Sequence, residues 1–359
     1  MKAKNKKVGV LTLPITTNYG GILQLFALYK VLQNLGYDVK HIRRRWNSSH
    51  YSLWHKFKRL VYQNLIVFKF KKFEKAYISN CTKKIESDID FKNQCNDFDV
   101  VVVGSDQVWR SKNTRGVGDN YFLDFINEKV KKVAYAASFG IDYWDEITPE
   151  HTADIKKCLQ DFTTITVREN SGVSICQDTF GVNAVQVLDP TLLLTSTDYI
   201  HYFNLKKRTD NRKILGVYLL DETPEKNKFI ESFALEHGYE VKRVNKTSLS
   251  RFGGVLNQDF TKASIKAWIS GIYNSDFLIT DSFHGTVFSV IFNKPFYSID
   301  NVQRGSTRFE SLFEYLGITG CLISNIDNFD ICTLSNINYK KINSLIDSLR
   351  SESLKYLEF

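Results

Sequence analysis

The sequence predicts an α/β protein with two domains, each built from parallel strands and helices, and a cleft between their strand ends. Short apolar runs alternate with segments of helical periodicity, and the alternation restarts after a polar stretch, residues 195–212. At 359 residues, the chain is also longer than one hydrophobic core commonly supports. We expect an N-terminal domain over residues 1–200, a C-terminal domain over residues 201–335 and a closing helix within residues 336–359.

The first elements form a βαβ unit. A strand over 8–13 leads through the loop 14–21 into a helix over 22–35, and a strand over 38–42 follows Gly36. Asn18 and the paired glycines Gly20 and Gly21 lie in that loop, where glycine allows close backbone approach to a ligand. The loop lacks the G-x-G-x-x-G pattern, so a dinucleotide site is not predicted.

Four further strands of the first domain each end in a polar or glycine-bearing turn. They are expected at 100–103, 133–137, 165–167 and 185–188, and the turns begin at Gly104, Ser138, Arg168 and Asp189. Because the carboxyl ends of parallel strands meet at one edge of a sheet, that edge is the candidate site.

The second domain repeats the alternation. We expect strands at 214–220, 240–244, 277–279 and 296–299, and helices at 224–237, 261–270, 285–292 and 308–316, with the closing helix after them at 342–356. Gly238 and Gly317 follow two of these helices and fit their C-terminal ends.

The segment from Ile279 to Thr286 is a strand that runs into a helix, with His284 in the first helical turn. Helix N-termini present free N–H groups and partial positive charge, which suit phosphate or carboxylate. A histidine there can hold an anion or transfer a proton. The alternative is structural, with Ser282 as an N-cap and His284 as a buried, hydrogen-bonded residue.

The formal net charge is +9, which favours anionic partners. Residues 43–76 contain ten Lys or Arg, one acid and interleaved aromatics, typical of a basic amphipathic helix. Three interpretations are open for it: a membrane-surface patch, a lip that binds an acceptor, or a solvated helical face. No helix-turn-helix, RRM or zinc pattern accompanies the charge, so nucleic acid is not an expected partner.

Six cysteines are scattered without CxxC spacing. They indicate reduced thiols in a cytoplasmic protein, and no zinc site is predicted because no two of them form a ligand pair. No apolar run approaches the ~18 residues that span a bilayer.

Six motifs, in order, resemble the polysaccharide pyruvyl transferase family over about residues 8–317. They are Asn18-Tyr19-Gly20-Gly21-Ile22-Leu23-Gln24 with Ala27-Leu28, Gly104-Ser105-Asp106-Gln107-Val108-Trp109, Tyr135-Ala136-Ala137-Ser138-Phe139-Gly140, Val167-Arg168-Glu169, Asp189-Pro190-Thr191 and Thr280-Asp281-Ser282-Phe283-His284-Gly285. The resemblance implies two Rossmann-like domains of the GT-B type. It also implies transfer of the pyruvyl group of phosphoenolpyruvate to a sugar, forming a ketal and releasing phosphate, without a cofactor or metal.

The resemblance places Asp106, Arg168 and His284 at positions that serve phosphoenolpyruvate binding or catalysis. His284 is the candidate acid or phosphate partner, Asp106 the candidate base, and Arg168 the candidate clamp for the donor anion. Each has a structural alternative: Asp106 as a helix cap, and Arg168 as the partner of Glu169 or another acid.

Further residues are assigned to binding or to structure. Asn18, Gly20, Gly21, Ser105 and Ser282 are further candidate substrate-binding residues, and Asn18 could instead only make its turn. Asp281 is expected to brace the His284 loop, and Trp109 and Trp144 are expected in the core, with stacking on a sugar as the alternative.

One departure concerns Ser282, where members of the family can carry arginine. Serine cannot supply the charge or bidentate fork of arginine, so Arg304 and Arg308 are the candidate replacements among the binding residues, or else surface residues. Two rival functions stay open: a glycosyltransferase with a nucleotide-sugar donor, and a non-catalytic scaffold for polysaccharide assembly. If the acceptor is lipid-linked, residues 43–76 are expected to anchor the protein peripherally on the inner face of the cell membrane.

Overall fold

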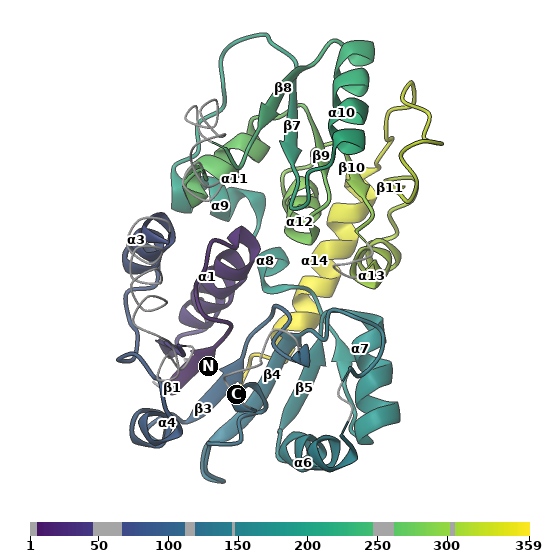
Figure 1. Ribbon diagram of the computed structural model, residues 1–359. Helices are drawn as coiled ribbons and strands as arrows, with labels where there is room; N and C mark the ends of the chain where they lie inside the picture. The colour runs from purple at the N-terminus through teal and green to yellow at the C-terminus, as the bar shows by residue number, and fades with distance from the viewer. Residues whose placement is uncertain (1–5, 46–66, 112–118, 146–147, 247–261, 302–305) are drawn as a thin grey trace, which may run out of the picture. The chain divides into compact units, whose positions relative to one another are not determined.

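The computed structural model describes residues 6–45, 67–111, 119–145, 148–246, 262–301 and 306–359. The chain divides into two compact units. Unit 1 comprises Met1–Leu193 and Asp347–Phe359, and unit 2 comprises Leu194–Ile346. Each unit contains one parallel sheet, which confirms the predicted α/β class (Figure 1).

Unit 1 is built on a six-stranded sheet in the order β2-β1-β3-β4-β5-β6. Its strands are β1 (Lys7–Leu11), β2 (Asp38–Ile42), β3 (Val100–Val103), β4 (Lys131–Ala137), β5 (Thr164–Val167) and β6 (Val185–Gln186). Its helices are α1 (Tyr19–Asn34), α3 (Phe68–Tyr77), α4 (Asp88–Cys95), η2 (Asn120–Phe122), α6 (Pro149–Gln160), α7 (Asn170–Ile175), η3 (Cys176–Phe180) and α8 (Pro190–Leu193). The strand order reverses between β1 and β3, and open α/β sheets bind ligands at that point.

Helix α1 begins at Tyr19, so the predicted loop over 14–21 is too long. Gly20 and Gly21 lie in the first helical turn, after Asn18 in an extended conformation. Tyr19 is buried against the ring of Phe70 in α3, with centroids 5.2 Å apart. This packing favours helix where the two glycines alone disfavour it.

Unit 2 is built on a five-stranded sheet in the order β11-β10-β9-β7-β8. Its strands are β7 (Ile214–Tyr218), β8 (Glu240–Arg243), β9 (Phe277–Thr280), β10 (Phe296–Ile299) and β11 (Leu322–Ile323). Its helices are α9 (Ser196–Phe203), α10 (Pro224–His237), α11 (Ile265–Tyr273), α12 (Phe283–Ile291), α13 (Thr307–Leu316) and the first part of α14 (Tyr339–Lys355). Here the strand order reverses between β7 and β9.

The polar stretch 195–212 contains α9, a helix that its composition conceals. Thr195 and Asp198 form a reciprocal capping box at its start. Tyr199 and Phe203 are buried. The helix thus combines a polar first turn with an apolar inner face.

The expected core position is confirmed for Trp109. Trp109 is buried in the unit 1 core, where its ring stacks on Phe122 and its indole N–H donates to the Tyr121 carbonyl at 3.0 Å. Trp144 packs against the same core, partly buried. The Trp109 ring therefore serves packing.

The basic segment 43–76 is described only at its two ends, since residues 46–66 lie outside the described part of the chain. Its second end forms α3, where Phe70 and Phe73 are buried and Phe68 is exposed. Phe73 lies edge-on to Phe26 of α1, with centroids 5.7 Å apart. None of the helices that can be described is long and apolar enough to cross a bilayer.

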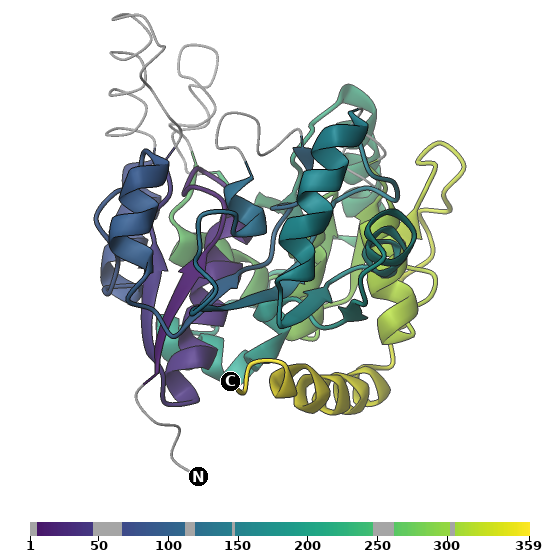
Figure 2. The same cartoon turned by 90° about the horizontal axis from the view of Figure 1, so that it is seen from below.

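The end of the chain returns to unit 1. Phe359 donates its N–H to the Tyr37 hydroxyl at 2.8 Å, and Lys6 Nζ donates to the Phe359 carbonyl at 2.8 Å. Figure 2 shows the yellow end of the chain beside the purple N-terminal elements. Residues far apart in sequence therefore form one unit.

Candidate functional site

The strand ends of unit 1 bring four predicted turns together around Arg168. This residue follows β5, and its side chain is 1% exposed. Its Nη1 donates to Asp189 Oδ2 at 3.1 Å and to the Ser105 hydroxyl at 3.4 Å. Its Nε lies 3.5 Å from Glu169 Oε2, and its Nη2 lies 3.9 Å from Asp106 Oδ1.

Arg168 is thus a buried cation among three carboxylates. Burial lowers its pKa, but the three negative charges outweigh burial and raise the pKa above the usual value. The guanidinium stays charged and fixes the carboxylates around it. The expected alternative of a contact with Glu169 is present, beside two other acids.

Asp106 lies at the end of β3 in a left-handed conformation, with φ of +79°. Its Oδ2 accepts from Asn18 Nδ2 at 3.3 Å, and its Oδ1 accepts from the Gln107 N–H at 2.9 Å. Asn18 does not cap α1 with its side chain. The Asn18–Asp106 pair therefore bridges the ends of β1 and β3, where the strand order reverses.

Gly21 makes this pair possible. A Cβ on Gly21 would lie 3.0 Å from Asp106 Oδ2 and 3.1 Å from Asn18 Nδ2, closer than most side-chain contacts. The backbone at Gly21 thus closely approaches the Asn18–Asp106 pair.

Two acids that were not among the predicted binding or catalytic residues, Glu169 and Asp189, hold the strand ends in place. Glu169 Oε1 accepts from the N–H groups of Phe139 and Gly140 at 2.8 and 3.2 Å. Asp189 accepts from the Ser105 hydroxyl at 2.9 Å and from the Thr191 hydroxyl at 2.7 Å. Both acids lie in the motifs named above, which could have marked them as site residues. Their hydrogen-bond partners could not be predicted, because these lie up to 84 residues away in the sequence.

The strand ends of unit 2 contain the histidine motif. Ser282 caps α12 by accepting from the Gly285 N–H at 3.4 Å, so its predicted structural role is present. His284 lies in the first turn, buried and edge-on to Phe283. A Cβ on Gly285 would clash with the Thr280 side chain, so glycine lets α12 pack closely on the end of β9.

Asp281 braces this region, as expected. Its carboxylate accepts from the N–H groups of Leu220 and Asp221 at 2.6 and 3.2 Å, which ties the ends of β7 and β9 together. Lys226 of α10 donates to the same carboxylate at 2.7 Å. The sequence analysis did not assign Lys226 a role.

Around the end of β10, Asn301 donates to Asp221 Oδ2 at 2.7 Å. Arg308, half-buried in α13, lies over the ring of Phe283 at 5.8 Å from its centroid. It is therefore next to the residue that precedes His284. Arg304, the other predicted cation, lies outside the described residues.

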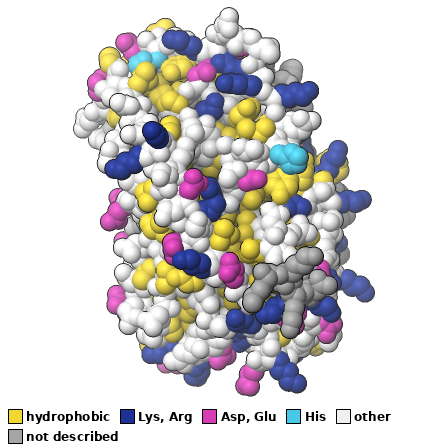
Figure 3. Space-filling model, turned by 180° about the vertical axis from the view of Figure 1, so that it is seen from behind, with side chains coloured by type: hydrophobic (Ala, Val, Ile, Leu, Met, Phe, Trp, Pro, Cys, Tyr) yellow, Lys and Arg dark blue, Asp and Glu magenta, His cyan; other side chains and the backbone are white. Residues whose placement is uncertain are grey.

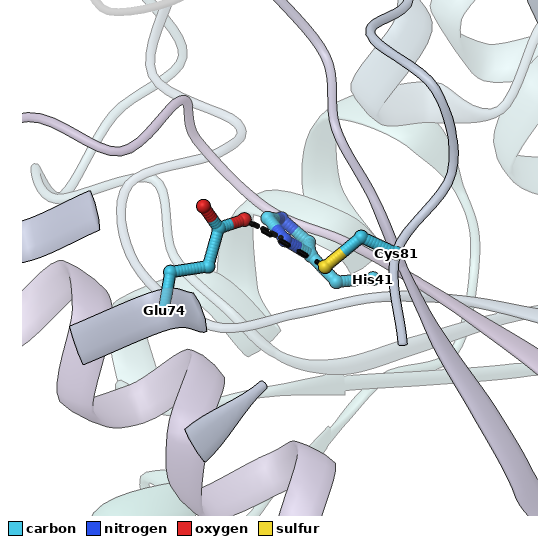
Figure 4. Close-up of side chains that lie close together, drawn as sticks. All are labelled: His41, Glu74 and Cys81. Atoms are coloured by element: carbon cyan, nitrogen blue, oxygen red, sulfur yellow. Dashed lines mark hydrogen bonds and ion pairs between the residues drawn. The ribbon is translucent and has the colours of Figure 1, made fainter. Parts of the chain in front are cut away.

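Lys and Arg side chains lie among acidic and hydrophobic ones on the face in Figure 3, so the basic excess is spread there. Among the described residues, one cluster has the composition of a metal site: His41, Glu74 and Cys81 in unit 1 (Figure 4). It is separate in sequence from the six motifs above.

The family model for polysaccharide pyruvyl transferase matches residues 18–303. Comparison with curated protein sequences gives no match. Among solved structures, the UDP-GlcNAc 2-epimerase from Neisseria meningitidis bound to UDP-GlcNAc is similar, at 10% identity over 97% of this chain and 99% of that chain, with a TM-score of 0.52. An alpha-glucosyltransferase in complex with UDP and a 13-mer DNA containing a HMU base is also similar, at 9% identity over 99% and 95%, with a TM-score of 0.50. These likenesses confirm a GT-B-like fold and show the fold alone.

Proposed function

The chain belongs to the polysaccharide pyruvyl transferase family, and we propose that it transfers the pyruvyl group of phosphoenolpyruvate to a sugar. The acceptor is a surface polysaccharide or its lipid-linked precursor, and the product is a pyruvate ketal. The observation that carries the proposal is the family match, which spans all six motifs, from Asn18 to Gly285.

The chemistry needs one acid and one base. Protonation of the donor's methylene carbon makes a methyl group and leaves C2 electrophilic. A sugar hydroxyl adds to C2 and loses its proton to the base. A second hydroxyl then forms the other C2–O bond as the C2–O bond to phosphate breaks. Phosphate leaves with the electron pair and takes up the proton of that hydroxyl.

We assign His284 as the acid or phosphate partner and Asp106 as the base that accepts the sugar's proton. His284 lies at the N-terminus of α12, where N–H groups and the helix dipole favour an anion. Arg308 supplies positive charge beside Phe283 in place of an arginine at Ser282. The buried contacts of Arg168 favour a positioning role, in which its guanidinium orients Asp106.

The test is phosphate release from phosphoenolpyruvate with a panel of hexose and N-acetylhexosamine glycosides. We expect release that depends on an acceptor and is lost in His284→Ala. The control is His201→Ala, an exposed histidine of α9, which should keep full activity. A protein that releases no phosphate and binds no phosphoenolpyruvate would overturn the proposal.

A second candidate function is glycosyl transfer from a nucleotide-sugar donor. Ser282, which lacks the charge of the arginine that family members can carry, favours a changed donor. Isothermal calorimetry separates the two candidates: heat with phosphoenolpyruvate supports pyruvyl transfer, and heat only with a UDP-sugar supports glycosyl transfer. If the protein binds neither donor, the result favours a non-catalytic scaffold for polysaccharide assembly.

We also propose that the basic segment 43–76 associates with an anionic membrane face that presents a lipid-linked acceptor. Its composition, ten basic residues with interleaved aromatics, supports this. Deleting residues 46–66 should reduce activity on the lipid-linked acceptor and leave activity on a soluble acceptor unchanged. Equal loss on both would contradict a role at the membrane.

A further inference from the structure

His41, Glu74 and Cys81 meet in unit 1 from three different segments: strand β2, helix α3 and the chain that follows α3 (Figure 4). His41 and Cys81 are paired as neighbours by a parallel bridge. The His41 N–H donates to the Asn80 carbonyl at 2.9 Å, and the Thr82 N–H donates to the His41 carbonyl at 2.9 Å. The backbone thus holds the imidazole and the thiol beside each other, and α3 places Glu74 against both.

The three side chains are a nitrogen, an oxygen and a sulfur donor at short range. Glu74 Oε1 lies 3.0 Å from His41 Nδ1 and 3.8 Å from Cys81 Sγ. All three donor atoms lie within 4.8 Å of one another. His41 and Glu74 are buried, while Cys81 is half-buried, so solvent can reach the sulfur side.

We propose that His41, Glu74 and Cys81 form a binding site for a zinc-type divalent cation, with solvent as the fourth ligand. Tetrahedral zinc holds nitrogen and oxygen ligands about 3.4 Å apart, and sulfur and oxygen ligands about 3.6 Å apart, from its usual bond lengths. The two separations from Glu74 Oε1 differ from these by a few tenths of an ångström, and the His41 nitrogen lies within 4.8 Å of the Cys81 sulfur. Coordination therefore needs rotation of the side chains to bring the nitrogen and the sulfur to one metal ion.

Metal binding changes the bonds in a defined way. His41 gives up the Nδ1 proton to solvent, which leaves a neutral imidazole protonated at Nε2, and the hydrogen bond between His41 and Glu74 is replaced by two bonds to the metal. Cys81 gives up its hydrogen bond to the Ile78 carbonyl, 3.0 Å away, and loses its thiol proton to solvent as the sulfur–metal bond forms. No oxidant or reductant is involved.

Arg43 is the group that opposes the site. Its Nε donates to Glu74 Oε1 at 2.8 Å, and its charge repels a cation. A carboxylate has two oxygens, however, and ligating carboxylates commonly accept a hydrogen bond from an outer partner. In the structure Arg43 donates to the same Oε1 that faces His41 and Cys81, so metal binding at Oε1 requires the guanidinium to shift to Oε2, in the outer position.

The choice of metal follows from the donor set. A thiolate, an imidazole and one carboxylate suit zinc, whereas magnesium and calcium prefer oxygen ligands alone. The site ties β2 to α3, so the bound metal would stabilise this edge of unit 1. It lies outside the chemistry proposed for pyruvyl transfer.

The experiment uses the full chain, freed of metal with a chelator and titrated with Zn²⁺ against a chromophoric competitor. We expect one Zn²⁺ per chain and a higher Tm with Zn²⁺. Co²⁺ in its place should give the absorption band of a thiolate–cobalt bond. A wild-type protein that binds no Zn²⁺ would overturn the proposal.

The decisive variant is Cys81→Ser, with Cys158→Ser as its control. Both thiols are half-buried. Cys81→Ser should weaken Zn²⁺ binding by more than ~100-fold, since even changes to outer partners cost 10–100-fold. It should also abolish the cobalt band. Cys158→Ser should bind like the wild type.

Near-wild-type Zn²⁺ affinity in Cys81→Ser would contradict the assignment. His41→Gln provides an independent readout if the serine variant is unstable. The glutamine should leave the thiol in place, weaken Zn²⁺ binding and remove the Zn²⁺-dependent rise in Tm. Unchanged binding there would also sink the proposal.

Discussion

At the scale of single residues, the contacts of Asp106 hold the proposed base in an unfavourable backbone conformation. A left-handed conformation is rare for a residue other than glycine and costs about 1–3 kcal/mol, so surrounding contacts must hold it. Asn18, the Gln107 N–H and Arg168 provide those contacts. Strain of this kind gathers at functional sites, which supports Asp106 as a site residue.

The first prediction concerns Asp106→Asn. Asparagine tolerates the left-handed region and keeps the size of the side chain, but it cannot accept a proton. We expect kcat to fall by about 10²–10⁴-fold and the free energy of unfolding to change by less than about 1 kcal/mol. Phosphate-release kinetics and urea unfolding measure the two effects. A kcat within threefold of wild type would exclude the role of base.

The second prediction concerns the acid stability of the metal-free protein. Burial raises the pKa of Glu74, but hydrogen bonds and charge from His41 and Arg43 outweigh it and lower that pKa below 4.5. A lowered carboxyl pKa stabilises the folded state above the unfolded-state pKa, and this stability is lost as pH falls through the folded-state pKa. Glu74→Gln should therefore flatten the acid limb of the unfolding free energy against pH. An unchanged slope below pH 4.5 would contradict this.

At the scale of elements, α10 shows what the sequence could predict. Both of its bounds agree with the prediction, because both ends carry local signals. Thr223 caps it, Pro224 opens it, and Gly238 ends it in a left-handed conformation.

Two other helices were placed less well. Helix α1 begins earlier than predicted because Tyr19 packs on Phe70, a contact with a residue 51 positions away. Tertiary burial, which no local pattern records, decided that case. Helix α9 was not predicted although the Thr195–Asp198 capping box is a local signal for its start, because its polar first turn conceals Tyr199 and Phe203.

The site was predictable to the same degree. Polar residues at the carboxyl ends of strands pointed to Asp106 and Arg168 in unit 1 and, separately, to His284 in unit 2, because the parallel strands of each sheet end at one edge. The burial of Arg168 among three acids depends on three strand ends meeting, so the sequence left it open. The cluster of His41, Glu74 and Cys81 was missed because the sequence was searched for paired cysteines. This cluster contains one cysteine, and its three residues lie in different segments.

The third prediction concerns the first turn of α1. In Gly21→Ala, the new Cβ would press on both Asn18 and Asp106 and separate them. Alanine favours helix by about 1 kcal/mol over glycine, so stability should hold while kcat falls. Combining Gly21→Ala with Asp106→Asn should cost little more than Asp106→Asn alone, because both act on one pair. Additive losses in kcat would show that Gly21 acts elsewhere.

At the scale of the whole molecule, the chain crosses from unit 1 to unit 2 and returns in α14. The returning segment is bound to unit 1 by specific contacts. The Leu188 N–H donates to the Ser353 hydroxyl at 3.1 Å, and Arg350 Nε donates to the Leu192 carbonyl at 3.0 Å. The last residues of the chain are thus part of the unit that contains Asp106.

The fourth prediction tests this return with two substitutions near the end of the chain. Leu357 is 0% exposed, so Leu357→Ala should leave a cavity in unit 1 and cost about 2–5 kcal/mol of unfolding free energy. Glu352 is its control, with a side chain that is 62% exposed and pairs only with the equally exposed Lys355 in the described contacts. Glu352→Ala should change stability by less than about 0.5 kcal/mol, because exposed ion pairs contribute little. Chemical denaturation of both variants measures the difference, and equal stability would mean that unit 1 folds without the end of the chain. A large loss confined to Leu357→Ala would show that residues after Ile346 stabilise the strand ends that hold the proposed base.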